Sequence, residues 1–150
     1  MKRIIGVVLA ILVCHSLIAQ VAPEYAKFHD AALSKFKKDT ATRDALNAEF
    51  FNDSGNPTNN RIQRSNEIMD ALIKIAPILV SDLMDTWVGC YSDNLLDKWG
   101  APDSTFKDTK GNTIWTYKFV NGVGNQRHIA TRQFYINLKN VIYTWRWEGL

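Results

Sequence analysis

The hydrophobic period of the chain changes at Leu95-Leu96-Asp97-Lys98-Trp99-Gly100-Ala101-Pro102, a helical stretch that ends in Gly-x-Pro. Leu95, Leu96 and Trp99 fall on one face at helical spacing. Ser92 is a good N-cap residue because its hydroxyl can accept a backbone N–H of the first turn. Gly100 suits the positive φ that often ends a helix, and Pro102 prevents continuation. We therefore expect a short helix over residues 93–99.

After Pro102 the apolar residues alternate with polar ones, which indicates strands. Residues 104–108 and 112–120 are predicted to form a hairpin around residues 109–111, with Gly111 at positive φ. Trp115 and Tyr117 then share one face with Phe119. Further strands are expected over residues 129–138 and 141–147, joined by a turn at residues 139–140.

The N-terminal half carries helical patterns. Residues 23–38, 42–51 and 60–75 are predicted helices, separated by a Thr-rich break at residues 40–42 and by turn residues 52–57. Pro77 is expected to kink or end the third helix, with residues 80–87 as a further short helix. The predicted buried sets are Tyr25, Phe28, Ala32 and Phe36 in the first helix, and Ile62, Ile68, Leu72 and Ile75 in the third.

These elements predict an α+β fold in which N-terminal helices pack on one face of a three- to four-stranded antiparallel sheet. The predicted organisation is a signal peptide at residues 1–19, a helical segment at 20–79 and an α+β domain at 80–150.

The first 19 residues are typical of a secretory signal, since Lys2 and Arg3 precede an apolar run over residues 4–13, and Ala19 suits cleavage. Cys14 follows the bulky Val13, which disfavours lipid attachment, and we expect membrane association only if Cys14 is lipidated. The sequence therefore predicts an exported protein that is periplasmic, associated with the outer membrane, or secreted.

Charge and cysteine content exclude several classes of protein. Loss of residues 1–19 would leave 16 of the 18 basic side chains against 15 acidic ones, so the net charge would fall from +3 to +1. Such a balance does not favour nucleic acid as a partner. Cys90 would be the remaining cysteine, and we expect it to be a small buried hydrophobe in a fold without disulfides.

No group of residues in the sequence forms a convincing catalytic or metal-binding set, so we predict no enzyme activity, no cofactor and no metal. His29 is expected on the solvated surface or at a helix edge, and Cys90 and His128 are 38 positions apart. Charged surfaces of two short helices are expected to account for four carboxylates, at Asp82, Asp85, Asp93 and Asp97.

Aromatic residues near the C-terminus are better candidates for function. Strand alternation should bury some of them, and the others, beside Arg132 and Arg146, have the composition of a binding hot spot. The candidate partner-binding residues are Tyr135, Tyr143, Trp145, Trp147 and Arg146.

Residues 80–148 resemble the SmpA/OmlA-like domain, the family of the small lipoprotein subunit of the bacterial outer-membrane barrel-assembly machine. The resemblance depends on the helix ending at Gly100-Ala101-Pro102, the strand with Trp115-Thr116-Tyr117, and the last strand over residues 141–147. It implies a layer of two helices and three strands, an envelope location and a role in protein contacts. The chain differs in lacking a good lipid-attachment cysteine and in its helical segment at residues 20–79.

The sequence thus predicts an exported, non-catalytic protein that binds or assembles with another envelope protein through residues 141–147 and 89–102. A secreted inhibitor is one alternative, with the loop at residues 121–127 entering the cleft of a hydrolase. Secreted inhibitors of β-lactamase share the layered architecture, but they have tandem copies and this chain has room for one. A protein that binds a small ligand or glycan is the other alternative.

Overall fold

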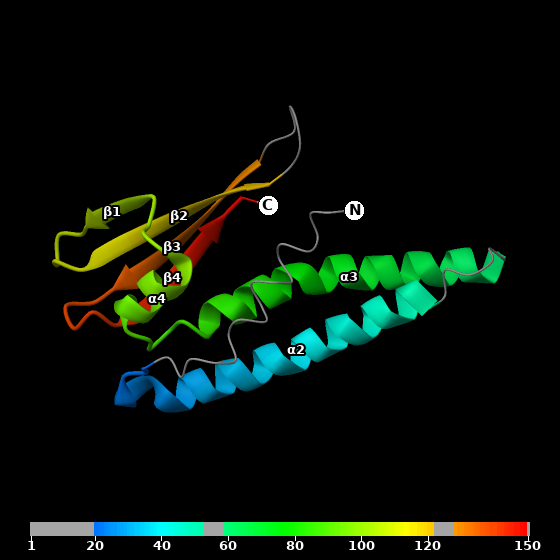
Figure 1. The fold of residues 1–150 in the computed structure, drawn as a ribbon, viewed down its shortest axis with the longest axis horizontal. Helices are drawn as coiled ribbons and strands as arrows, with labels where there is room; N and C mark the ends of the chain where they lie inside the picture. The colour runs from blue at the N-terminus through cyan, green and yellow to red at the C-terminus, as the bar shows by residue number, and fades with distance from the viewer. Residues whose placement is uncertain (1–19, 53–58, 122–127, 150) are drawn as a thin grey trace.

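The computed structural model describes residues 20–52, 59–121 and 128–149 (Figure 1). A short 3-10 helix, Pro23–Tyr25, leads into the helices α2 (Ala26–Asn52), α3 (Asn59–Asp85) and α4 (Ser92–Trp99). The strands are β1 (Ser104–Lys107), β2 (Thr113–Asn121), β3 (His128–Ile136) and β4 (Ile142–Glu148). The predicted signal peptide, Cys14 and most of the predicted inhibitory loop lie outside the described residues.

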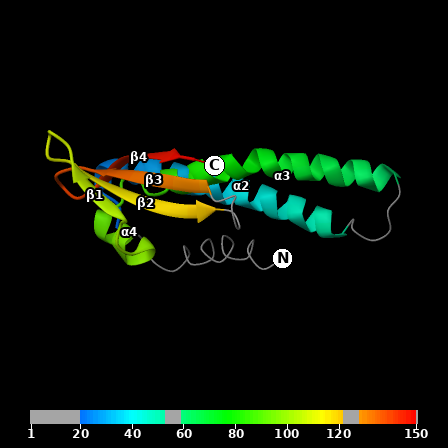
Figure 2. The same cartoon turned by 90° about the horizontal axis from the view of Figure 1, so that it is seen from above.

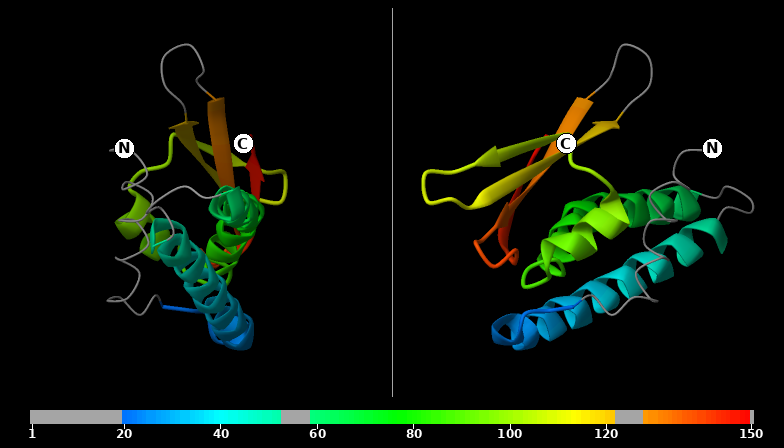
Figure 3. Two further views of the ribbon diagram at one scale, coloured as in Figure 1. Left: turned by 90° about the vertical axis from the view of Figure 1, so that its right-hand side faces the viewer. Right: turned by 60° about the vertical axis from the view of Figure 1, so that its left-hand side comes forward.

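The four strands form an antiparallel sheet in the order β1-β2-β3-β4, and the helices lie on one of its faces (Figures 1 and 3). This confirms the predicted α+β fold. Figure 2 shows α2 and α3 side by side as a hairpin that extends well beyond the ends of the strands. None of the helices in the described part of the chain is long and apolar enough to cross a membrane.

Helix α2 runs without interruption from Ala26 to Asn52, so the predicted Thr-rich break at residues 40–42 is wrong. Threonine disfavours a helix by only about 0.7 kcal/mol or less relative to alanine. Packing against α3 over the length of the hairpin outweighs that cost, and Arg64 of α3 donates to Glu49 of α2 near the far end. Threonine does disfavour the helix, but this energy is small, and the contact between α2 and α3 outweighs it.

Helix α3 also continues through Pro77, so of the two outcomes expected at this proline, a kink or an end to the helix, the end is wrong. The predicted boundary between residues 79 and 80 consequently lies inside α3. Of the expected buried set, Ile68 is buried and Leu72 is half-buried, but Ile62 is 52% exposed. Ile62 lies five helical turns before Val80, on the same side of α3 and about 27 Å away, so the sheet that covers Val80 does not reach it.

Helix α4 begins at Ser92, and Tyr91 is the capping residue, so the predicted Ser92 cap is wrong. Ser92 is buried instead, and it donates its backbone N–H to Asn140 O at 2.8 Å. The other end agrees with the prediction: Gly100 has φ +76° and donates to Leu96 O. The β1–β2 hairpin is also confirmed, with Gly111 at φ +85°.

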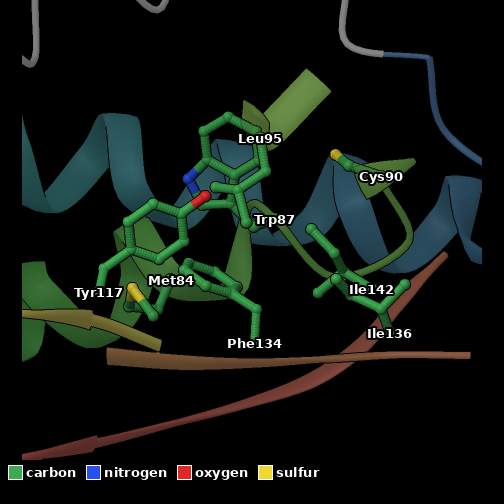
Figure 4. Packing of buried hydrophobic residues seen from close by; sticks show 8 residues of the cluster. All are labelled: Met84, Trp87, Cys90, Leu95, Tyr117, Phe134, Ile136 and Ile142. Atoms are coloured by element: carbon green, nitrogen blue, oxygen red, sulfur yellow. The ribbon is translucent and has the colours of Figure 1, made fainter. Parts of the chain in front are cut away.

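The core lies between the sheet and the helices, and Figure 4 shows its packing. Phe134 and Ile136 of β3 meet side chains from α3, α4 and the segment that joins them. The predicted aromatic face of β2 is confirmed, since Tyr117 is buried while Trp115 and Phe119 pack against the same cluster. The cluster consists of Met84, Trp87, Cys90, Leu95, Tyr117, Phe134, Ile136 and Ile142.

Candidate functional site

An irregularity in β4 decides which aromatic residues are available for binding. Tyr135 pairs with Thr144, but Ile136 pairs with Ile142, so Tyr143 has no partner in β3. Such an extra residue is a β-bulge. Its cause lies at the outer edge of β4, where Ile142 exchanges two backbone hydrogen bonds with the segment at Gly89 and Cys90, 2.7 and 2.9 Å long.

The bulge divides the five candidate residues between the two faces of the sheet. Tyr143 contacts Tyr135, with ring centroids 6.3 Å apart, on the face opposite the buried Phe134. Trp145 is on the helix-facing side, where its indole N–H donates to Asp85 Oδ1 at 2.8 Å. By strand alternation Trp147 shares that side with Trp145, and Arg146 shares the open face with Tyr135 and Tyr143.

The open face of the sheet carries an apolar row that crosses all four strands. The paired residues are Phe106 with Ile114 and Ile114 with Tyr135, and the row ends at Tyr143 on the bulge. Phe106 is 65% exposed and the other three are half-buried. We call Phe106, Ile114, Tyr135 and Tyr143 the open-face row.

Sequence reasoning did not identify Phe106 and Ile114. A signal for them was present, because a hairpin centred on Lys110 places residues 106 and 114 opposite each other. Its predicted aromatic face contains Trp115, so Ile114 must point to the other side. The bulge had no such signal, since it depends on a contact between residues more than 50 positions apart.

Lysines surround the end of the sheet that carries the open-face row. Lys107 ends β1, and Lys110 and Lys139 lie in the two neighbouring turns. A methyl group on Gly111 would lie 3.3 Å from Leu138 Cδ2, which places these turns next to each other.

The carboxylate of Asp108 at this end is engaged within its own turn. It accepts hydrogen bonds from Lys110 N, Asn112 N and Asn112 Nδ2, and the bonds from Asn112 lower its pKa most. The nearby charge of Lys110 also lowers this pKa, so the ionised Asp108 partly balances the lysine charge at this end of the sheet.

The four carboxylates considered for catalysis separate in the structure. Asp93 and Asp97 are exposed on α4, as expected. Asp82 is buried between α2 and α3, where it pairs with Lys35, so its predicted surface position is wrong. The reason is that α3 continues past Pro77 and presents Asp82 to α2. Asp85 accepts the Trp145 bond, so the set does not form a carboxylate pair across a cleft.

Cys90 is buried, as predicted, and it has an unpredicted neighbour. His29 Nδ1 lies 3.8 Å from the Cys90 sulfur, although the two residues are 61 positions apart, and the half-buried His29 agrees with the helix edge expected for it. Burial raises the pKa of the Cys90 thiol to about 12, and the thiol donates to Thr86 O. The sulfur is therefore protonated at neutral pH and is a poor nucleophile.

Among the described residues, no three His, Cys, Asp or Glu side chains come close enough together to hold a metal ion. Comparison of the chain with protein-family models, curated proteins and solved structures finds no match.

Proposed function

We propose that this chain is an exported, non-catalytic module of the bacterial envelope and that the open face of its sheet binds a partner protein. The observation that supports it is the open-face row, a continuous apolar strip on a sheet face that no described helix covers (Figure 3). Contiguous exposed apolar surface in a monomeric protein commonly marks an interaction site.

The chemistry of the row suggests what the partner presents. Tyr135 and Tyr143 lie edge to face, and such rigid aromatic residues lose little conformational entropy on binding. Lys110 and Lys139, in the two turns at one end of the row, add positive charge beside the apolar centre. The complementary partner surface is apolar in the middle and acidic at its rim, because charges at a rim guide association and exclude wrong partners.

The envelope location in this proposal rests on two features of the sequence. Residues 1–19 have the pattern of a secretory signal, and residues 80–148 resemble the SmpA/OmlA-like domain, whose members act through protein contacts. The long α2–α3 hairpin is an addition to that pattern, and we propose that the contact surface nevertheless lies on the sheet.

The test is a quantitative pull-down from bacterial envelope extract with the purified exported protein as bait. Wild type is compared with a Phe106→Ala/Tyr143→Ala double variant, and Phe28→Ala/Ile73→Ala serves as the matched control because both of its residues are exposed on the helices. Circular dichroism and thermal unfolding check that all three proteins fold.

A specific partner should be recovered with wild type and the control and be reduced at least tenfold with the open-face variant. Purified partner should then bind wild type directly, and Lys110→Glu/Lys139→Glu should weaken that binding. Equal recovery with the open-face variant, or no partner with wild type, would contradict the proposal.

A further inference from the structure

Arg132 occupies an unusual position on β3. It lies on the helix-facing side of the sheet, in register with Tyr117 of β2 and Trp147 of β4. Its guanidinium carbon lies 4.4 Å from the ring centroid of Phe119 and 5.6 Å from that of Trp99. Two aromatic rings on β2 and α4 therefore hold the charged group at the edge of the core.

The guanidinium of Arg132 has no counterion in the described part of the chain. No carboxylate or carbonyl oxygen of the described residues accepts a hydrogen bond from it, although it has five N–H donors. Burial lowers the pKa of Arg132, and no acidic neighbour offsets this. An arginine still remains protonated under such conditions, so the site holds a partly desolvated positive charge.

A second donor without an acceptor adjoins the same ring system. The indole N–H of Trp87 is buried and has no hydrogen-bond partner. The Trp87 ring packs edge to face on Trp99, with centroids 6.1 Å apart. Trp99 thus contacts both Arg132 and Trp87, and buried donors without acceptors are rare in native proteins.

We infer that Arg132, Trp99 and Phe119 form a binding site for a small organic carboxylate with a planar apolar group. A carboxylate matches the flat fork of a guanidinium and accepts two parallel N–H bonds. One negative charge neutralises the one positive charge, whereas a phosphate dianion would bring excess charge into a half-buried site. Trp99 and Phe119 are half-buried beside the guanidinium, so the apolar group of the ligand would lie against the parts of these rings that remain exposed.

This site is independent of the proposed function. The open-face row is on the other face of the sheet, so the carboxylate site can fail while partner binding holds, and the reverse is equally possible.

The experiment titrates the purified protein with benzoate and follows binding by calorimetry and by the NMR signals of the Arg132 Nε–H and tryptophan indole N–H groups. Benzamide tests the need for charge, and inorganic phosphate tests the class of anion. The variants are Arg132→Gln, Arg132→Lys and, as control, Arg146→Gln on the open face, where Arg146 pairs with Glu148.

Benzoate should bind saturably, shift the Arg132 signal, and bind at least tenfold more weakly to Arg132→Gln but equally well to Arg146→Gln. Arg132→Lys keeps the charge but loses the forked N–H donors of the guanidinium, and it should bind benzoate at least fivefold more weakly. If Arg132→Gln does not fold, this variant tests whether Arg132 binds the carboxylate. The inference is overturned by absence of saturable binding to wild type, by unchanged affinity of the Arg132 variants, or by benzamide or phosphate binding at least as tightly as benzoate.

Discussion

The sheet layer and the α2–α3 hairpin differ in how they are held together. The sheet layer has a cluster of eight buried residues drawn from α3, α4, three strands and their connections. The hairpin beyond it depends on contact between two helices, and it leaves several apolar side chains in solvent. The exposed apolar residues of the two helices include Phe28, Ile62, Met69, Ile73 and Ile78.

Helix α3 takes part in both regions and shows why they differ. Ile62, Met69, Ile73, Val80 and Met84 fall within about 60° of one another around the helix axis. Met84 is part of the core cluster and Val80 packs against it, whereas the first three side chains are exposed. The same helix face is therefore core at one end and surface at the other.

The largest expected effect is in the sheet layer. Phe134 is fully buried, and Phe134→Ala should lower the free energy of unfolding by about 3–5 kcal/mol. Phe36→Ala in the hairpin should cost about 3 kcal/mol, the lower end of that range, because two helices can close on a cavity more easily than a sheet and helices together. Urea unfolding measures both, and a cost for Phe36→Ala equal to or above that for Phe134→Ala would remove the distinction between the regions.

Gly89 lies between the two regions, and its substitution should destabilise the protein nearly as much as that of Phe134. Its φ is +91°, and a Cβ there would lie 2.2 Å from Tyr25 Cβ. Gly89→Ala should destabilise the protein by about 2–4 kcal/mol, from backbone strain and overpacking together.

Gly100→Ala is the matched control, since Gly100 also has positive φ but nothing lies within 4 Å of its Cβ position. It should cost about 1–2 kcal/mol from strain alone. Thermal unfolding of the two variants separates the contributions, and equal costs would show that the contact with Tyr25 is unimportant.

How far the sequence predicts the fold depends on where the deciding interactions lie. The end of α4 at Gly100 and the turn at Gly111 were predictable because a single glycine determines each backbone turn. The continuity of α2 and α3 was not, because contact between the helices overrides the Thr-rich segment and Pro77.

The candidate site was predictable in part. Tyr135, Tyr143 and Arg146 lie on the open face, but the bulge moves Trp145 and Trp147 out of alternation with Tyr143. That bulge follows from the pairing of Ile142 with Gly89 and Cys90, which no local pattern in β4 reveals.

A smaller effect is expected from Asp82 in the hairpin. Burial raises the pKa of Asp82 above its usual 3.8, Asp39 adds to this, and Lys35 opposes it. Between the unfolded and folded pKa values the folded state then binds more protons, so stability falls as pH rises through that interval.

Asp82→Asn should remove this part of the pH dependence. Urea midpoints measured from pH 4 to pH 7 should fall less steeply for Asp82→Asn than for wild type. Asp44→Asn, on the exposed side of α2, should keep the wild-type slope. Parallel slopes for wild type and Asp82→Asn would show that the carboxyl of Asp82 does not titrate as described.

The smallest effect should come from the exposed stripe of α3. Ile73 is 64% exposed, and Ile73→Ala should change the free energy of unfolding by no more than about 0.5 kcal/mol. Val80→Ala, on the same helix face under the sheet, should cost clearly more. Similar losses for both variants in urea unfolding would mean that something covers Ile73 in solution.

Amide hydrogen exchange tests the central claim most directly, namely that the sheet layer holds the fold while the hairpin beyond it is less stable. Amides of β2 and β3 near Tyr117 and Phe134 should exchange only through global unfolding. Amides of α3 around Ile68 to Ile73 should exchange through local opening at a clearly lower free energy. Equal protection of the two regions, or stronger protection of the hairpin, would contradict the account.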